Sequence, residues 1–217
     1  MIHSAFNLRT VIGAVLCLSL SAFAQTDSTK GLEVDVSASG TSRLKLALPS
    51  AMRVGETSDT TGIRESIEQT LYRDLGLSGF FELIPNDRLL HDASTEGMKP
   101  RFSDYFNVGA QAVIKASYEI RDAKKKKRSV VLDLQLFSVA TEQRVKLESP
   151  FDQPKVLSLD PVSLRRYTTQ FADEVIRHFT GEKGIFSSRL AVVKRSKRGK
   201  EIYMLSADGL EEVRLTR

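Results

Sequence analysis

Apolar residues recur along this chain with two different periods, and the chain alternates between them. In residues 112–120 and 130–136 every second residue is apolar, which is the period of a strand with one buried face. In residues 61–76 and 164–179 the step is three or four residues, which places the apolar side chains on one face of a helix. The alternation predicts an α/β pattern in which strands are combined with two main helices.

The ends of the two helices are marked by residues that suit helix termini. Asp160 and Pro161 start the second helix well, because Asp accepts bonds from free first-turn amides and proline needs none there. Gly181 is expected to close that helix, and Gly76 the first one, in the left-handed conformation. His178 lies close to the helix end, so we expect it to interact with the last carbonyls and not to act in catalysis.

Shorter strands are predicted around these elements. Residues 32–36 alternate apolar with acidic side chains, residues 44–48 form a strand that Pro49 closes, and residues 80–84 read as a buried strand. Phe102, Tyr105 and Phe106 have helical spacing, and we expect them to face the core, although such a cluster also suits base stacking. The basic run 124–128 joins the two long strands of a hairpin. It is expected to be a solvated loop, with phosphate contact as the alternative.

The last 29 residues, 189–217, differ from the rest of the chain in their pattern of strands and in their charge. Three short strands are predicted at 189–193, 201–205 and 213–216, with a tight turn at Asp208 and Gly209. This pattern is typical of one β-propeller blade, which cannot close a ring alone. The segment holds eight basic and four acidic residues, whereas residues 25–188 are balanced, so the net charge of +5 does not indicate a nucleic-acid domain.

The amino-terminal 24 residues have the pattern of a secretory leader. Arg9 precedes an apolar run, and Ala22, Phe23 and Ala24 supply a signal-peptidase site, so the mature chain is expected to begin at Gln25 in the periplasm. The apolar run is too short for a membrane anchor, which needs about 20 residues. We therefore expect no stable membrane insertion after cleavage.

The inventory of reactive residues argues against an enzyme. Cys17 is the single cysteine and lies in the leader, and His3, His91 and His178 show no metal-ligand spacing. The sequence has no Gly-x-Ser-x-Gly elbow and no phosphate-binding loop. We therefore expect no catalytic residues, no cofactor and no metal.

Several motifs together resemble a known family. Residues 180–191, Thr-Gly-Glu-Lys-Gly-Ile-Phe-Ser-Ser-Arg-Leu-Ala, are similar to the junction between the amino-terminal domain and the propeller of the TolB family, periplasmic components of the Tol-Pal system. Residues 165–167, 171–175, 78–81 and 108–113 agree with that resemblance. Thr168 and Thr169 depart from it, because many relatives carry a histidine after the tyrosine.

The resemblance implies an organisation and a role. After the leader (1–24), it implies a mobile segment with a partner-binding strand (25–43) and an α/β domain (44–185). The implied domain has a mixed sheet with two main helices and is similar to the anticodon-binding fold. An incomplete first propeller blade (186–217) follows it. In the family the amino-terminal strand docks onto TolA, the propeller binds Pal, and the system supports outer-membrane integrity and cell division. The propeller is largely missing here, so Pal binding is not expected. The implied partner-binding residues are Leu32, Glu33, Val34, Asp35, Val36 and Ser37.

Two other interpretations remain open. One is a stand-alone periplasmic adaptor that binds another envelope protein or a cell-wall component. The other is a nucleic-acid module, suggested by the fold relationship and the basic run 124–128, although export argues against it. The nucleotide sequence beyond Arg217 distinguishes an adaptor from a truncated propeller protein.

Overall fold

The computed structural model describes residues 43–89, 95–121, 128–196 and 199–216. The predicted leader, the predicted docking strand 32–37 and the lysines of the run 124–127 lie outside these residues.

The central element is a seven-stranded mixed sheet. Along its main path the order is β3-β1-β4-β5-β6, while β2 pairs with β4 and β7 pairs with β5. Pairing is parallel among β1, β2, β3 and β4 and antiparallel from β4 onward. The strands are β1 (Leu44–Ala47), β2 (Met52–Val54), β3 (Phe81–Ile84), β4 (Ala112–Arg121), β5 (Ser129–Ser138), β6 (Gln143–Arg144) and β7 (Lys155–Ser158).

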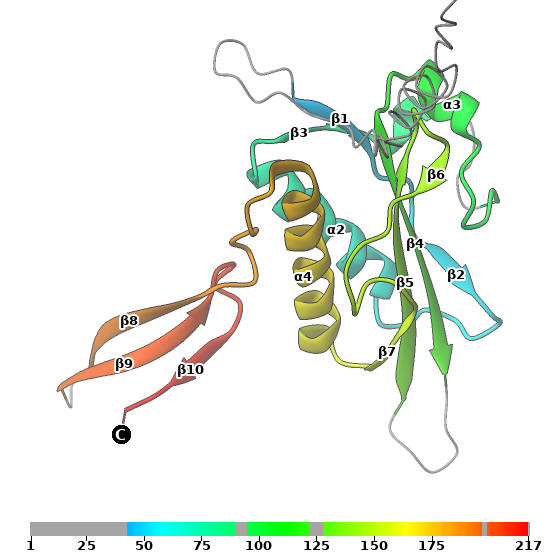
Figure 1. Cartoon of the computed structure of the whole chain (residues 1–217). Coiled ribbons are helices and arrows are strands. Elements are labelled where there is room, and N and C mark those ends of the chain that lie inside the picture. The colour runs from blue at the N-terminus through cyan, green and yellow to red at the C-terminus, as the bar shows by residue number, and fades with distance from the viewer. Residues whose placement is uncertain (1–42, 90–94, 122–127, 197–198, 217) are drawn as a thin grey trace, which may run out of the picture. The chain divides into compact units, whose positions relative to one another are not determined.

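The two longest strands of this sheet, β4 and β5, form an antiparallel hairpin (Figure 1). Its register runs from Ala112 opposite Ser138 to Arg121 opposite Ser129, which confirms the predicted antiparallel pair. Because side chains alternate between faces, Ile114 and Leu136 enter the larger core together. The alternating apolar residues of β4 and β5 therefore lie on the face of the sheet that the larger core covers.

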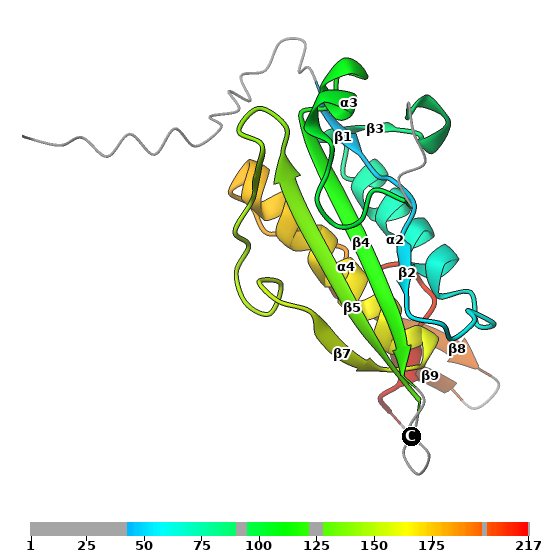
Figure 2. The same cartoon turned by 90° about the vertical axis from the view of Figure 1, so that its right-hand side faces the viewer.

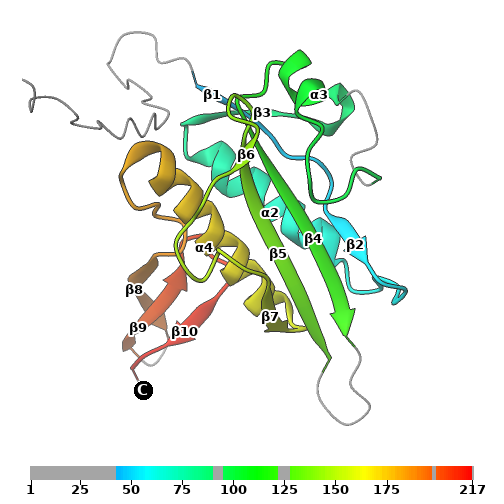
Figure 3. The same ribbon diagram turned by 45° about the vertical axis from the view of Figure 1, so that its right-hand side comes forward.

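Two long helices cover that face (Figure 3). They are α2 (Ile63–Leu77) and α4 (Pro161–Thr180), and Figure 2 shows them behind the sheet. Ile67 of α2 and Phe171 of α4 are fully buried in the larger core. The structure confirms the two helices predicted from the apolar period and the mixed sheet implied by the resemblance.

The opposite face carries a smaller core. There α3 (Phe102–Asn107) and a short 3-10 turn, η1 (Asn86–Arg88), accompany the sheet, and Tyr105 packs with Val113. Phe102 and Tyr105 are buried as predicted. Phe106 is 70% exposed, so the core prediction for that residue is wrong. A helix this short presents only one narrow face to the sheet.

The predicted boundaries of α4 are confirmed in detail. The Asp160 carboxylate accepts a hydrogen bond of 2.8 Å from the Ser163 N–H, and Pro161 opens the first turn. Gly181 adopts the left-handed conformation with φ of 76°, and its N–H donates to the Arg177 carbonyl.

The predicted end of α2 is wrong. The helix runs through Gly76 to Leu77, and Ser78 donates its N–H to the Asp74 carbonyl. The left-handed residue is Gly79, with φ of 78°. Glycine at position 76 is compatible with the helix but does not end it.

The terminal sheet is formed by β8 (Arg189–Ser196), β9 (Gly199–Ser206) and β10 (Glu212–Arg214), in the antiparallel order β10-β9-β8. The predicted turn forms after β9, where Gly209 has φ of 71° and donates to the Ser206 carbonyl. Among the described residues, neither hydrophobic core includes a side chain beyond Phe186. The terminal sheet therefore stands outside the core of the α/β domain.

Candidate functional site

The partner-binding residues predicted from the sequence, Leu32, Glu33, Val34, Asp35, Val36 and Ser37, lie outside the described residues. The structure neither groups nor separates them. The best-defined polar site in the described chain is instead the junction where the chain leaves α4 and enters the terminal sheet.

One buried carboxylate holds the connecting segment of this junction. Asp173 on α4 is 4% exposed and accepts the N–H groups of Phe186 at 2.9 Å and Ser187 at 2.7 Å. Gly184 approaches so closely that a Cβ added there would lie 2.2 Å from Asp173 Oδ1 and 2.6 Å from its Cα. Only glycine fits at position 184, and the connecting segment is therefore fixed to the helix.

A second set of contacts involves the turn after β9. Asp208 Oδ2 lies 2.9 Å from Arg165 Nε of α4 and 3.3 Å from Arg73 Nη1 of α2. Glu211 accepts from Arg165 at 3.1 Å and from Arg166 at 2.8 Å. The turn thus presents two carboxylates to arginines of both long helices. We call these five side chains the arginine–carboxylate network.

The turn itself aims those carboxylates. Asp208 Oδ1 accepts from the Ser206 hydroxyl and from the Leu210 N–H, while the Ser206 hydroxyl also accepts from the Glu211 N–H at 2.9 Å. Burial works against ionisation of Asp208, but these hydrogen bonds and the charges of Arg165 and Arg73 lower its pKa overall. The carboxylate is therefore charged at neutral pH and available to both arginines.

A polar cavity of about 220 Å³ lies at the same junction. Its walls include Arg165, Gln170 and Ser187 on one side and Ser206 and Asp208 on the other. Arginine, amide and hydroxyl groups can position a polar or charged group by hydrogen bonding. Among the described residues no three His, Cys, Asp or Glu side chains are grouped so that they could hold a metal ion.

The two faces of the terminal sheet differ in chemistry. In register, Val193 pairs with Ile202 and Ala191 with Met204, so these four share one face, which is largely apolar. Leu190 and Val192 pair with Leu205 and Tyr203 on the other face. That face also carries the ion pairs of Lys194 with Glu212 and of Arg214 with Glu201.

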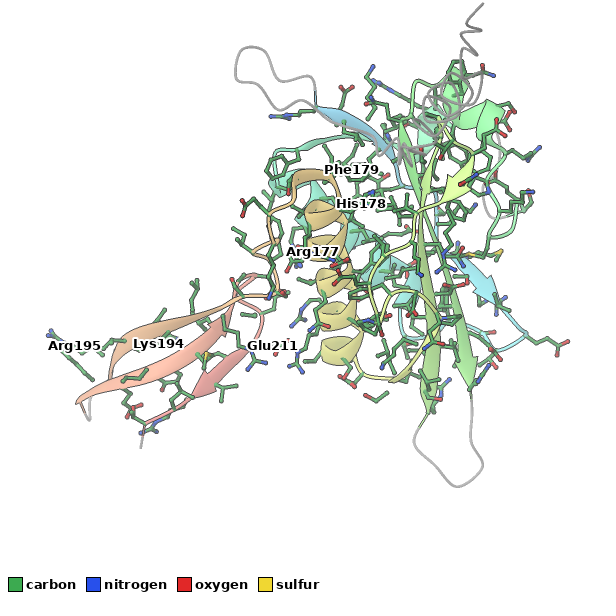
Figure 4. The ribbon with its side chains drawn as sticks, in the orientation of Figure 1. Arg177, His178, Phe179, Lys194, Arg195 and Glu211 are labelled. Carbon is green, nitrogen blue, oxygen red and sulfur yellow. The ribbon has the colours of Figure 1, made fainter. Side chains whose placement is uncertain are left out.

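Figure 4 labels Arg177, His178 and Phe179 at the end of α4, Lys194 and Arg195 on β8, and Glu211 in the turn after β9. Arg177 binds Glu174 at 2.7 Å, and His178 packs edge-on against Phe179 with ring centroids 5.0 Å apart. Burial lowers the pKa of His178, which favours a neutral imidazole. The neutral ring packs against Phe179, which supports a packing role for His178. It gives less support to the predicted interaction with the carbonyls at the helix end.

A buried ion pair secures the opposite face of the main sheet. Lys115 Nζ of β4 lies 2.7 Å from Glu96 Oε2, and the Tyr105 hydroxyl donates to the same oxygen at 2.8 Å. The Lys115 and Glu96 side chains are 2% and 1% exposed. Breaking such a pair leaves a buried charge uncompensated, so the pair fixes the segment around Glu96 to the sheet.

Sequence reasoning missed the arginine–carboxylate network and Asp173. The network joins residues far apart in the sequence, and no local spacing reveals them. The sequence did offer one signal for the network and one for the Asp173 contact. Asp208 was predicted to lie in a turn, and Gly184 lies within residues 180–191, the stretch that resembles the TolB junction. Neither signal identified the arginines.

The fold and junction define a class of protein: an α/β domain with a polar attachment for a following β-sheet. The TolB amino-terminal domain model matches residues 32–145, which is just over half of the chain. The chain therefore belongs to the TolB amino-terminal domain family, as the motifs at 78–81 and 108–113 indicated.

Relatives over most of the chain are Tol-Pal system proteins TolB. The chain is 25% identical over 210 residues to that of Syntrophotalea carbinolica, covering 95% of this chain and 44% of the relative. It is 28% identical over 186 residues to that of Geobacter sulfurreducens, covering 84% of this chain and 39% of the relative. The chain thus spans less than half the length of these relatives.

A solved structure is similar in fold. The crystal structure of TolB from Acinetobacter baumannii superposes with a TM-score of 0.54 at 19% identity, covering 80% of this chain and 39% of that chain. At this identity the likeness concerns the fold alone. Within the described residues, no helix is both long enough and apolar enough to cross a membrane.

Proposed function

We propose that this chain is an exported, non-enzymatic component of a Tol-Pal system in the periplasm. Its role is to dock a TolA-like protein through residues 32–37 and so to support outer-membrane integrity and cell division. The observation that carries the proposal is the family match, which begins at residue 32, the first residue of the predicted docking strand. The leader pattern at residues 1–24 supports export.

Docking is proposed to occur by strand addition. Residues 32–36 alternate apolar and acidic side chains, so an extended conformation places Leu32, Val34 and Val36 on one side. Main-chain hydrogen bonds to a partner sheet then give affinity, and pockets for the alternate apolar side chains give specificity. Glu33 and Asp35 remain on the outer side.

The chemistry of the described residues supports a binding role. At the junction the carboxylates are engaged by arginines or backbone amides. Such groups hold elements in position and are not arranged as a nucleophile beside a base. Pal binding is left outside the proposed role, because the resemblance assigns it to a propeller.

The test is isothermal titration of the full chain against the carboxyl-terminal domain of a TolA-like partner. Val34→Ala loses only side-chain contact, whereas Val34→Pro also removes a ladder N–H, so Val34→Pro is expected to weaken binding more. Removing one apolar anchor is expected to cost about tenfold or more in affinity. Equal affinities for the parent and Val34→Pro would contradict strand addition.

A further inference from the structure

The terminal sheet is attached to the α/β domain by polar contacts. Several of its large apolar side chains are exposed, with Leu190 at 54%, Val193 at 64% and Ile202 at 41%, and the others are at most half-buried. In the described part of the sheet the only buried residue is Glu201, which pairs with Arg214 of the same sheet. Apolar burial therefore contributes little to holding the sheet in place.

Two attachments of different character remain. The first is the Asp173 clamp, in which a nearly buried carboxylate accepts two backbone N–H groups and Gly184 packs directly on it. Groups this buried are screened little by dissolved salt. The connecting segment around residues 184–188 is therefore expected to stay on α4 at any ionic strength.

The second attachment is the arginine–carboxylate network. Its side chains are partly open to solvent, with Arg165 at 15%, Glu211 at 20% and Arg166 at 46% exposed. Partly exposed ion pairs contribute modestly and weaken as salt shortens the screening length from about 10 Å at 0.1 M to about 3 Å at 1 M. This attachment is the one that salt can release.

We infer that the terminal sheet is a detachable element that swings about a fixed connection. With the arginine–carboxylate network closed, the sheet sits on α2 and α4. With the network open, the sheet keeps its own strand pairing and remains tethered at the Asp173 clamp. The device changes the orientation of whatever surface the sheet carries, without unfolding the α/β domain.

A distance measurement between the two parts tests this inference. The full chain with Cys17→Ser offers a cysteine-free background, and spin labels are placed at Gln69→Cys on α2 and Lys200→Cys on β9, both exposed. At low salt the label distance is expected to have one narrow distribution. Raising sodium chloride to about 1 M is expected to increase the detached population about tenfold and to broaden the distribution.

Two variants distinguish release of the terminal sheet from a general effect of removing one negative charge. Asp208→Asn removes the charge that binds Arg165 and Arg73 and is expected to give the broad distribution already at low salt. Glu212→Gln is the matched control, because its ion pair with Lys194 lies within the terminal sheet. The control is expected to keep the narrow distribution at low salt.

Amide hydrogen exchange completes the test. In the released state Phe186 and Ser187 are expected to stay protected by Asp173, whereas a sheet that unfolds loses protection along β9 as well. A distribution that stays narrow in 1 M salt and in Asp208→Asn would overturn the inference. So would equal broadening in Glu212→Gln, or loss of protection along β9. The salt titration of the labelled chain does not depend on whether Asp208→Asn folds.

Discussion

Asp59 shows how one side chain organises the start of a helix. It accepts N–H groups of Ile63 and Arg64 at 3.1 Å each and the Tyr118 hydroxyl at 2.9 Å, which links α2 to β4. Burial opposes its charge, but these bonds prevail and lower the pKa of Asp59 to about 2. Asp59 organises a helix start for which no residue was named from the sequence, which showed only the apolar period over residues 61–76.

The charge of Asp59 is expected to make stability depend on pH. Because its folded pKa lies below the ordinary value of 3.8, its stabilisation is present above that pH and is lost as the pH falls through about 2. Asp59→Asn is expected to lower the free energy of unfolding at pH 7 by about 1 kcal/mol after solvent screening. Urea unfolding from pH 7 to pH 2 measures this.

The control for that prediction is Asp87→Asn, which removes the same charge from an exposed residue of η1. It is expected to change the unfolding free energy little. A gap between the parent and Asp59→Asn that stays constant down to pH 2 would show that the cap acts through shape and not through charge.

Two glycines are expected to respond in opposite directions to the same change. At Gly76 a Cβ would meet Leu83 Cδ1 at 3.5 Å, an ordinary contact, and alanine suits a helix interior better by about 1 kcal/mol. Gly76→Ala is therefore expected to raise the unfolding midpoint. Gly184→Ala must displace Asp173 and is expected to cost about 1–3 kcal/mol, with faster exchange at Phe186 and Ser187.

The pair of alanine variants has a clear contrary result. If Gly184→Ala left exchange at Phe186 and Ser187 unchanged, the close approach to Asp173 would not hold the connecting segment. If Gly76→Ala lowered the midpoint, glycine at position 76 would be required by packing and not merely tolerated.

At the scale of elements, long periodic segments were predictable and short ones were not. The α4 helix has a strong period, an Asp-Pro start and a glycine end, so sequence and structure agree at both termini. The end of α2 was missed because Gly76 and Gly79 both suit a left-handed residue, and the turn into β3 selects the second. Strands β2 and β7 have three and four residues and depend on pairing with β4 and β5.

The faces of the terminal sheet show the same limit. Alternation groups Leu190 with Val192 in one strand and Ile202 with Met204 in the next, and from the sequence alone the two pairs are compatible with one apolar strip. The register places Val192 opposite Tyr203 and Val193 opposite Ile202, so the two pairs lie on opposite faces. Alternation within each strand was correct, but the relative register of two strands cannot be read from either one.

For the whole molecule, the attachment of the terminal sheet could not be read from the sequence. Arg73, Arg165 and Asp208 are separated by up to 135 residues, and ordinary surface charges look the same in a sequence. What the sequence did show was the specific stretch 180–191, which contains Gly184 and leads into β8. Local motifs therefore marked the junction but not its ion pairs.

The terminal sheet is expected to be the first part of the described chain that a protease opens. It lacks a covered apolar face, and small sheets without a second packing layer are marginally stable. Limited trypsin digestion is expected to cut first within residues 194–200 and to leave a resistant core ending near Arg189. A first cut at a basic residue of the α/β domain, with the segment 194–200 still intact, would contradict this expectation.

The central proposal is that residues 32–37, within the segment 25–43, dock a TolA-like partner. The most direct measurement is calorimetric titration of the full chain with the partner's carboxyl-terminal domain, with and without an excess of a peptide spanning residues 25–43. The account predicts that the peptide abolishes the binding heat, because it occupies the same edge of the partner's sheet. Unchanged affinity in the presence of saturating peptide would contradict the claim and place binding on the folded domain.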